Sequence, residues 1–138
     1  MGILNQTQTT PQGFVDNHGH ALVEGEEVYF AFRTIRDWIA FTDWRMIYVD
    51  VQGILGNKKE YLTVPYRSIT AFSITSAGKI DIDAEIAVFL SGHPPIEFKV
   101  GKFTNTEALQ KLLGKQYVDY IKAPNHDAEG SQDASKAN

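Results

Sequence analysis

Large apolar residues alternate with polar ones along most of the chain from residue 27 to residue 100, and this two-residue period is typical of β-strands. The alternation is clearest in residues 80–90, where Asp81, Asp83 and Glu85 are predicted to face outward. Turn-forming segments separate seven such runs, which cover residues 27–34, 37–42, 45–51, 59–64, 70–75, 80–90 and 96–100. We therefore predict seven antiparallel strands.

The period changes to three and four residues after position 104, which predicts one C-terminal amphipathic helix. Its apolar face comprises Leu109, Leu112, Leu113, Tyr117, Tyr120 and Ile121. Thr104 followed by Glu107 matches a capping box at its start, and Pro124 predicts its end near Lys122. Such a helix covers an apolar surface, so we expect a mainly β fold: a strongly bent sheet or partly open barrel capped by the helix. A flatter α+β sandwich fits the same element order.

The two ends of the chain differ in composition from its middle. Residues 1–23 are polar and rich in turn formers, which predicts a loose N-terminal arm with one helical turn. Residues 123–138 lack any large apolar side chain and cannot offset the entropy of ordering, so we predict a disordered tail. The folded domain is then expected to span residues 24–122.

Composition narrows the classes of function. At 138 residues the chain is the size of one domain, and its formal net charge of -4 argues against nucleic acid as a partner. The absence of Cys excludes disulfides, thiolate metal sites and cysteine nucleophiles. No secretory signal pattern and no run of about 20 apolar residues is present, so we expect a cytoplasmic protein.

A series of residues spaced along the chain carries a resemblance to a known family: Arg36 to Thr42, Arg45 to Ile47, Val49, Asp50, Gln52, Gly53, Lys58 to Tyr61, Pro65, Tyr66, Ser68, Ile69, Asp81, Asp83 and Glu85. Through these residues, the stretch 22–121 resembles the bacterial pleckstrin-homology-like domain family. The resemblance implies a pleckstrin-homology (PH) fold of seven strands in two near-orthogonal sheets with a C-terminal helix. It also implies cyclic homo-oligomeric rings that form through side-by-side sheet contacts and present a hydrophilic surface to an unknown protein partner. No helical hairpin follows the cap helix, which favours a five-membered ring.

Charged strand positions are the first candidates for an interface. Asp81, Asp83 and Glu85 place neighbouring carboxylates about 7 Å apart along one strand face, where they repel one another unless a basic group lies opposite. The same positions are also compatible with an ordinary hydrated face. The resemblance implies that an adjacent protomer supplies complementary charge through Arg36, Asp37 and Arg45.

Trp44 is a second kind of interface candidate. It occupies a polar turn beside Asp43, where a large apolar side chain is exposed in a monomer. Aromatic residues are enriched in the cores of interfaces. We therefore predict that Trp44 lies at a contact between protomers.

Other sites have weaker support in the sequence. Arg33 and Arg36, even with Lys58 and Lys59, form too small a basic set to predict a membrane lipid as a partner. His18 and His20 supply only two metal ligands, so we predict no metal site and no cofactor.

Catalysis also has little support. Ser68 with His93 is the only nucleophilic set, and no pattern predicts that they meet, so we expect no enzyme. The alternative function is binding of a small apolar ligand or a lipid headgroup by the barrel. Leu109 and Leu113 distinguish the two functions, because a helix that plugs the barrel leaves no room for a ligand.

Overall fold

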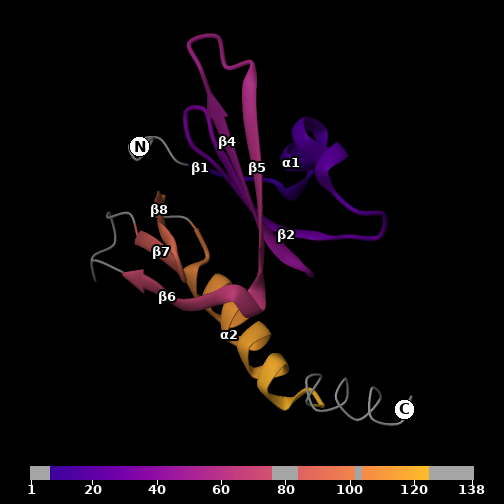
Figure 1. The fold of residues 1–138 in the computed structure, drawn as a ribbon, viewed down its shortest axis with the longest axis vertical. Helices are drawn as coiled ribbons and strands as arrows, with labels where there is room; N and C mark the ends of the chain where they lie inside the picture. The colour runs from indigo at the N-terminus through magenta and orange to yellow at the C-terminus, as the bar shows by residue number, and fades with distance from the viewer. Residues whose placement is uncertain (1–6, 76–83, 102–103, 125–138) are drawn as a thin grey trace.

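The computed structural model describes residues 7–75, 84–101 and 104–124, and it contains two antiparallel sheets and two α-helices (Figure 1). The five-stranded sheet has the order β1-β2-β3-β4-β5, with β1 Thr7–Thr9, β2 Val28–Arg33, β3 Trp38–Thr42, β4 Arg45–Gln52 and β5 Lys58–Pro65. The three-stranded sheet has the order β6-β7-β8, with β6 Ile69–Thr75, β7 Ala84–Leu90 and β8 His93–Val100. The helices are α1 Pro11–His18 and α2 Thr106–Lys122, with short 3-10 turns η2 Gly19–Ala21 and η3 Tyr66–Ser68.

The seven predicted strands are confirmed as β2 to β8, and the largest difference is at β8. This strand begins at His93, three residues earlier than predicted, although Pro94 and Pro95 follow. Proline is tolerated there because β8 is an edge strand of its sheet. The first four residues of the predicted 80–90 run lie outside the described residues. No strand ladder joins the two sheets in the described part of the chain, so the fold is open and not a closed barrel.

The main core lies between the inner faces of the two sheets. Phe32 and Phe41 of the five-stranded sheet meet Phe98 of β8, with ring centroids 5.7 Å and 6.4 Å from that of Phe98. Leu109 and Leu113 of α2 are buried in the same cluster. The aromatic contacts and the helix therefore hold the two sheets together.

A second core, which the sequence did not predict, lies on the outer face of the five-stranded sheet. Here α1 packs Phe14, which has no exposed surface, against Trp38, with ring centroids 5.9 Å apart. Because both faces of β3 are covered, all five of its residues are buried. The prediction of a loose arm is wrong for residues 7–21. Thr10 as N-cap and Pro11 at N1 start a helix in this polar segment. The helix then places the aromatic side chain of Phe14 against the sheet, which anchors the segment.

The helix α2 ends at Lys122, as predicted, but its start and the cover of its apolar face differ from the prediction. Asn105, not Thr104, is the N-cap, and its side chain accepts a hydrogen bond of 3.0 Å from the N–H of Ala108. The predicted capping box is therefore wrong; Glu107 pairs with Lys111 instead. The last turns of α2 extend past the sheets (Figure 1), so only the first half of the predicted apolar face is covered.

A buried ion pair connects segments that are distant in sequence. Arg45, at the start of β4, donates to Glu26 from Nε at 2.9 Å and from Nη2 at 2.8 Å, and the Glu26 side chain is fully buried. The same guanidinium donates to Thr63 on β5 and to the carbonyl oxygen of Ala21. Thr42 donates to Glu26 at 2.6 Å. This network fixes the chain that leads from α1 into β2.

The network also changes the acidity of Glu26. Burial opposes the ionised carboxylate, but hydrogen bonds from Arg45, from Thr42 and from the N–H of Val23 outweigh it and lower the pKa to about 2 from its ordinary value of 4.5. The folded-state pKa is below the unfolded one. The resulting stabilisation is therefore complete above pH 4.5 and is lost as the pH falls toward 2.

Replacing Phe14 by Ala should lower the free energy of unfolding by about 3 to 5 kcal/mol, because it empties a fully buried aromatic site. Urea denaturation of the full chain measures this. Val15→Ala is the matched control, since Val15 lies on the same helix and is 39% exposed. Equal effects of the two substitutions would show that α1 does not anchor the fold.

Replacing Glu26 by Gln should cost about 3 kcal/mol at neutral pH, because it leaves the largely buried guanidinium of Arg45 without its counter-charge. The difference between wild type and variant should shrink as the pH falls from 4.5 toward 2. Urea midpoints across that range measure it. Glu107→Gln, which removes an exposed carboxylate, should change stability far less at every pH in this range. A difference that is constant with pH would contradict the assigned pKa.

Candidate functional site

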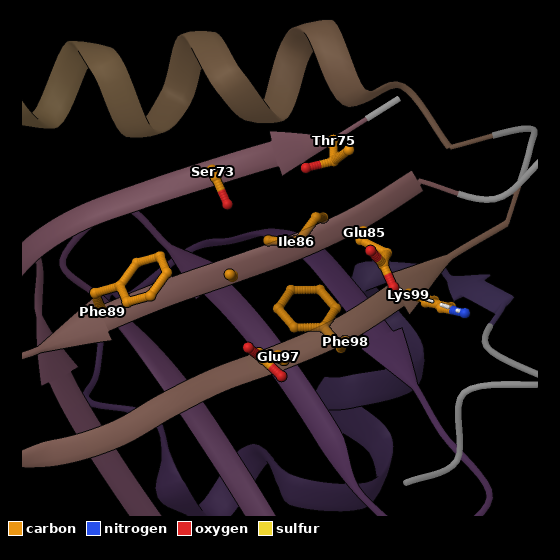
Figure 2. Close-up of a pocket in the computed structure, with 9 residues that line it drawn as sticks. Ser73, Thr75, Glu85, Ile86, Phe89, Glu97, Phe98 and Lys99 are labelled. Carbon is orange, nitrogen blue, oxygen red and sulfur yellow. Dashed lines mark ion pairs between the residues drawn. The ribbon is translucent and has the colours of Figure 1, made fainter. Parts of the chain in front are cut away.

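The outer face of the three-stranded sheet carries a groove of about 300 Å³ (Figure 2). Its side chains come from all three strands: Ser73 and Thr75 from β6, Glu85, Ala87 and Phe89 from β7, and Glu97 and Lys99 from β8. All seven are exposed or half-buried, in contrast to the outer face of the other sheet, which α1 covers.

Strand register explains why this face is hollow. Thr75, Glu85 and Lys99 lie in one row across β6, β7 and β8. Ser73, Ala87 and Glu97 form the next row in the same way. On this face of β7, the small side chain of Ala87 lies between the larger side chains of Glu85 and Phe89. The middle of the sheet is therefore recessed, and Phe89 lies beyond the recess (Figure 2).

The groove contains two carboxylates that differ in their partners. Glu85 forms an ion pair of 3.7 Å with Lys99, and both side chains are partly exposed, so the pair contributes little stability. Glu97 has no hydrogen bond or ion pair to any residue in the described ranges. The groove therefore combines an apolar floor at Ala87, an apolar wall at Phe89 and a free carboxylate.

The predicted site residues are not gathered at one place within the chain. Glu85 lines the groove, whereas Asp81 and Asp83 lie outside the described residues. Arg36 donates to the carbonyl oxygen of Gly53, which joins the β2–β3 and β4–β5 turns.

Asp37 and Arg45 also have partners inside the chain. Asp37 accepts from the N–H of Val51 at 2.9 Å and from the Tyr48 hydroxyl at 3.1 Å, and Arg45 belongs to the buried network with Glu26. No hydrogen bond or ion pair within the described residues joins these groups to Glu85. Their contact with an adjacent protomer stays a prediction.

Trp44 is half-exposed, at 50%, in the turn between β3 and β4. Its backbone N–H donates to the Thr42 hydroxyl, which fixes the turn while the indole remains at the surface. In the single chain the Trp44 side chain is therefore exposed, as expected. Its role at a contact between protomers stays a prediction.

Sequence reasoning missed most of the groove. The alternation in residues 96–100 already places Glu97 and Lys99 on the same outward face. The register that puts them beside Ala87 depends on pairing between strands, which no local pattern encodes.

The structure brings together one pair that the sequence left apart. Ser68 and His93 both line a groove of about 380 Å³ that β5 residues also line. No hydrogen bond between them is found in the described part of the chain. Instead, Nδ1 of His93 lies 2.6 Å from the carbonyl oxygen of Pro94 and donates to it.

His18 serves the second core. Its ring is buried against Trp38 and Tyr61, and its Nδ1 lies 3.0 Å from the Tyr61 hydroxyl. Burial and the nearby positive charges of Lys59, His20 and Arg33 lower the pKa of His18. Within the described residues, no group of three or more His, Cys, Asp or Glu side chains is placed to hold a metal ion.

The helices offer no route through a bilayer: none in the described part of the chain combines the length and the apolar character of a membrane span.

Comparison with known proteins identifies the family. The chain is 40% identical over 115 residues to the uncharacterized protein YjqA of Bacillus subtilis, covering 81% of this chain and 92% of that protein. A crystal structure of a DUF1696 family protein with a pleckstrin-homology domain from Shewanella loihica is 33% identical and superposes with a TM-score of 0.67, covering 80% of this chain and 96% of the other. A pleckstrin-homology domain from Shewanella amazonensis is 31% identical, with a TM-score of 0.55, and covers 76% of this chain and 86% of the other. The family model for the bacterial PH domain matches residues 1–117, and the chain belongs to this family.

Proposed function

We propose that this chain is a non-enzymatic interaction module that assembles with copies of itself and presents the groove on β6, β7 and β8 to a protein partner. The observation that carries the proposal is the uncovered outer face of the three-stranded sheet, with the free carboxylate of Glu97 beside an apolar hollow. A surface of this kind suits recognition better than chemistry, because it exposes its charged groups to water.

The chemistry of the groove favours a basic side chain of the partner. A Lys or Arg stem packs along apolar surface while its charged end stays near water. In the groove, Ala87 and Phe89 supply the apolar surface and Glu97 supplies a carboxylate for a charge-assisted hydrogen bond. Glu85 is already paired with Lys99, which leaves Glu97 as the preferred acceptor.

Uncovered apolar side chains support self-association. They lie in β2, in the β3–β4 turn and along the last turns of α2: Tyr29, Trp44, Tyr117, Val118, Tyr120 and Ile121. Aromatic residues with little local cover are typical of interface cores. With the resemblance to ring-forming family members, these residues favour a homo-oligomeric ring, and a five-membered one.

The alternative function, a small apolar ligand or a lipid headgroup held between the sheets, has less support. Leu109 and Leu113 of α2 are buried in the main core together with Phe98. They occupy the space that a ligand would need.

Light scattering on a size-exclusion column should give a mass near five times 15.4 kDa for the full chain. Trp44→Ser and Ile121→Ser should shift the mass toward the monomer, because they remove apolar contact area. Val15→Ser is the control, since Val15 is also exposed but belongs to α1, which packs at the Trp38 end of β3 and not at the Trp44 turn. A monomer at tens of micromolar would contradict the assembly.

Peptides selected from a random library against the full chain should carry Lys or Arg beside aliphatic residues. Glu97→Lys should weaken their binding, measured by calorimetry, by at least about tenfold, because it replaces the acceptor with a like charge. Glu24→Lys makes the same change of charge at an exposed position outside the groove and should leave binding unchanged. Peptides without basic residues, or equal binding to the Glu97→Lys variant, would overturn the assigned role of the groove.

A further inference from the structure

The hairpin of β4 and β5 ends in two aliphatic side chains that no other part of the described chain covers. Ile54 is 101% exposed and Leu55 is 86% exposed. The hairpin projects beyond the rest of the molecule (Figure 1), so these side chains stand at its far end. We call Ile54 and Leu55 the apolar tip. In the adjoining β2–β3 turn, Ile35 is also largely exposed.

The turn that presents the tip is held in place. Gly53 and Gly56 have φ of 85° and 67°, values that favour glycine, and the N–H of Gly56 donates to the carbonyl oxygen of Gly53 at 3.2 Å. Arg36 from the β2–β3 turn donates to the same carbonyl oxygen. The two turns therefore support each other, and the backbone keeps the apolar tip away from the core.

Positive charge gathers around the apolar tip although the chain as a whole is acidic. Residues 34–37 and 51–59 contain Arg36, Lys58 and Lys59 against Asp37 alone, a net charge of +2 in a chain of -4. The Asp37 carboxylate is bound by the Val51 N–H and the Tyr48 hydroxyl.

The nearest acidic pair is set back from the turn. Gln52 pairs with Lys58 and Val51 with Lys59, and Asp50 pairs with Glu60 in the following row. Asp50 and Glu60 are therefore roughly 7 Å further along the hairpin than Gln52 and Lys58. Moving away from its end, the hairpin is first apolar, then basic, then acidic.

We propose that the apolar tip inserts into the surface of an anionic lipid bilayer, with Lys58, Lys59 and Arg36 at the level of the headgroups. Aliphatic side chains gain free energy by leaving water for the acyl boundary, and basic residues within a Debye length are attracted by anionic lipids. A projecting turn has little flat area for a protein partner, whereas a fluid interface accommodates it. The sequence argued against membrane lipid from the lysines and arginines alone; the exposure of Ile54 and Leu55 is what alters that expectation.

Vesicle sedimentation of the full chain tests the proposal, with vesicles of phosphatidylcholine alone or mixed with phosphatidylglycerol. We expect binding to the mixed vesicles only. The double substitution Lys58→Gln, Lys59→Gln should weaken this binding by about thirtyfold, because it removes the attraction of two basic residues to the anionic surface. Ile54→Ser with Leu55→Ser should weaken it by at least about tenfold. Val15→Ser with Val23→Ser and Lys111→Gln with Lys115→Gln are the matched controls and should bind like wild type.

Insertion itself is read from a fluorophore at the tip. The chain has no native Cys, so Leu55→Cys gives a single labelling site for an environment-sensitive dye. Its emission should shift to the blue on anionic vesicles, and a dye at Val23→Cys should not shift. Binding that survives loss of Ile54 and Leu55, or competition by free inorganic phosphate, would overturn insertion. A fall in solution mass of the Ile54→Ser, Leu55→Ser variant would assign the tip to a contact between copies instead.

The proposal is independent of the groove. Ala87→Leu, which fills the groove and changes no charge, should leave vesicle binding unchanged, because Ala87 lies on the other sheet. Loss of vesicle binding in this variant would contradict the separation of the two surfaces.

Discussion

The buried pair of Arg45 and Glu26 is the interaction on which much of the architecture depends. It connects the chain before β2 to the start of β4, and through Thr63 and Ala21 it reaches β5 and the end of the α1 segment. Burying both charges is favourable only because every carboxylate oxygen has a donor. With this segment fixed, α1 can cover the outer face of the five-stranded sheet. The outer face of the three-stranded sheet stays exposed and carries the groove.

How far the sequence predicted the fold depended on the range of the interactions involved. Alternation predicted β2 to β8 because it depends on neighbours two residues apart. It failed for α1, whose polar sequence is held by Phe14 and His18, and for Asn105, a better N-cap than the Thr104 beside it. The groove needed the register of β7 against β8, which places Glu97 beside Ala87. That register is set by tertiary packing and leaves no local signature.

Arg45 shows that a charged residue that matches a family pattern can have its partners inside the same chain and need not indicate an interface. From the sequence, it was a candidate for contact with Glu85 of another protomer. In the structure its guanidinium already donates to Glu26, Thr63 and Ala21. Asp37 likewise accepts from the chain's own Val51 and Tyr48. Such groups stabilise turns and strand ends, whereas Glu97, which no residue in the described ranges binds, has its acceptor capacity available for a partner.

The arrangement of the surfaces makes self-association and membrane contact compatible. Trp44 precedes the first residue of β4, and the apolar tip follows the last one, so strand geometry separates them by roughly 24 Å. The uncovered end of α2 also points away from the hairpin (Figure 1). Copies that associate through Trp44 and the end of α2 therefore leave every tip free. Several tips on one assembly would bind a bilayer far more tightly than one, because each later insertion is intramolecular. Weak binding of each single tip to the bilayer would then suffice for stable attachment. The strength of attachment would depend on how many copies the assembly contains.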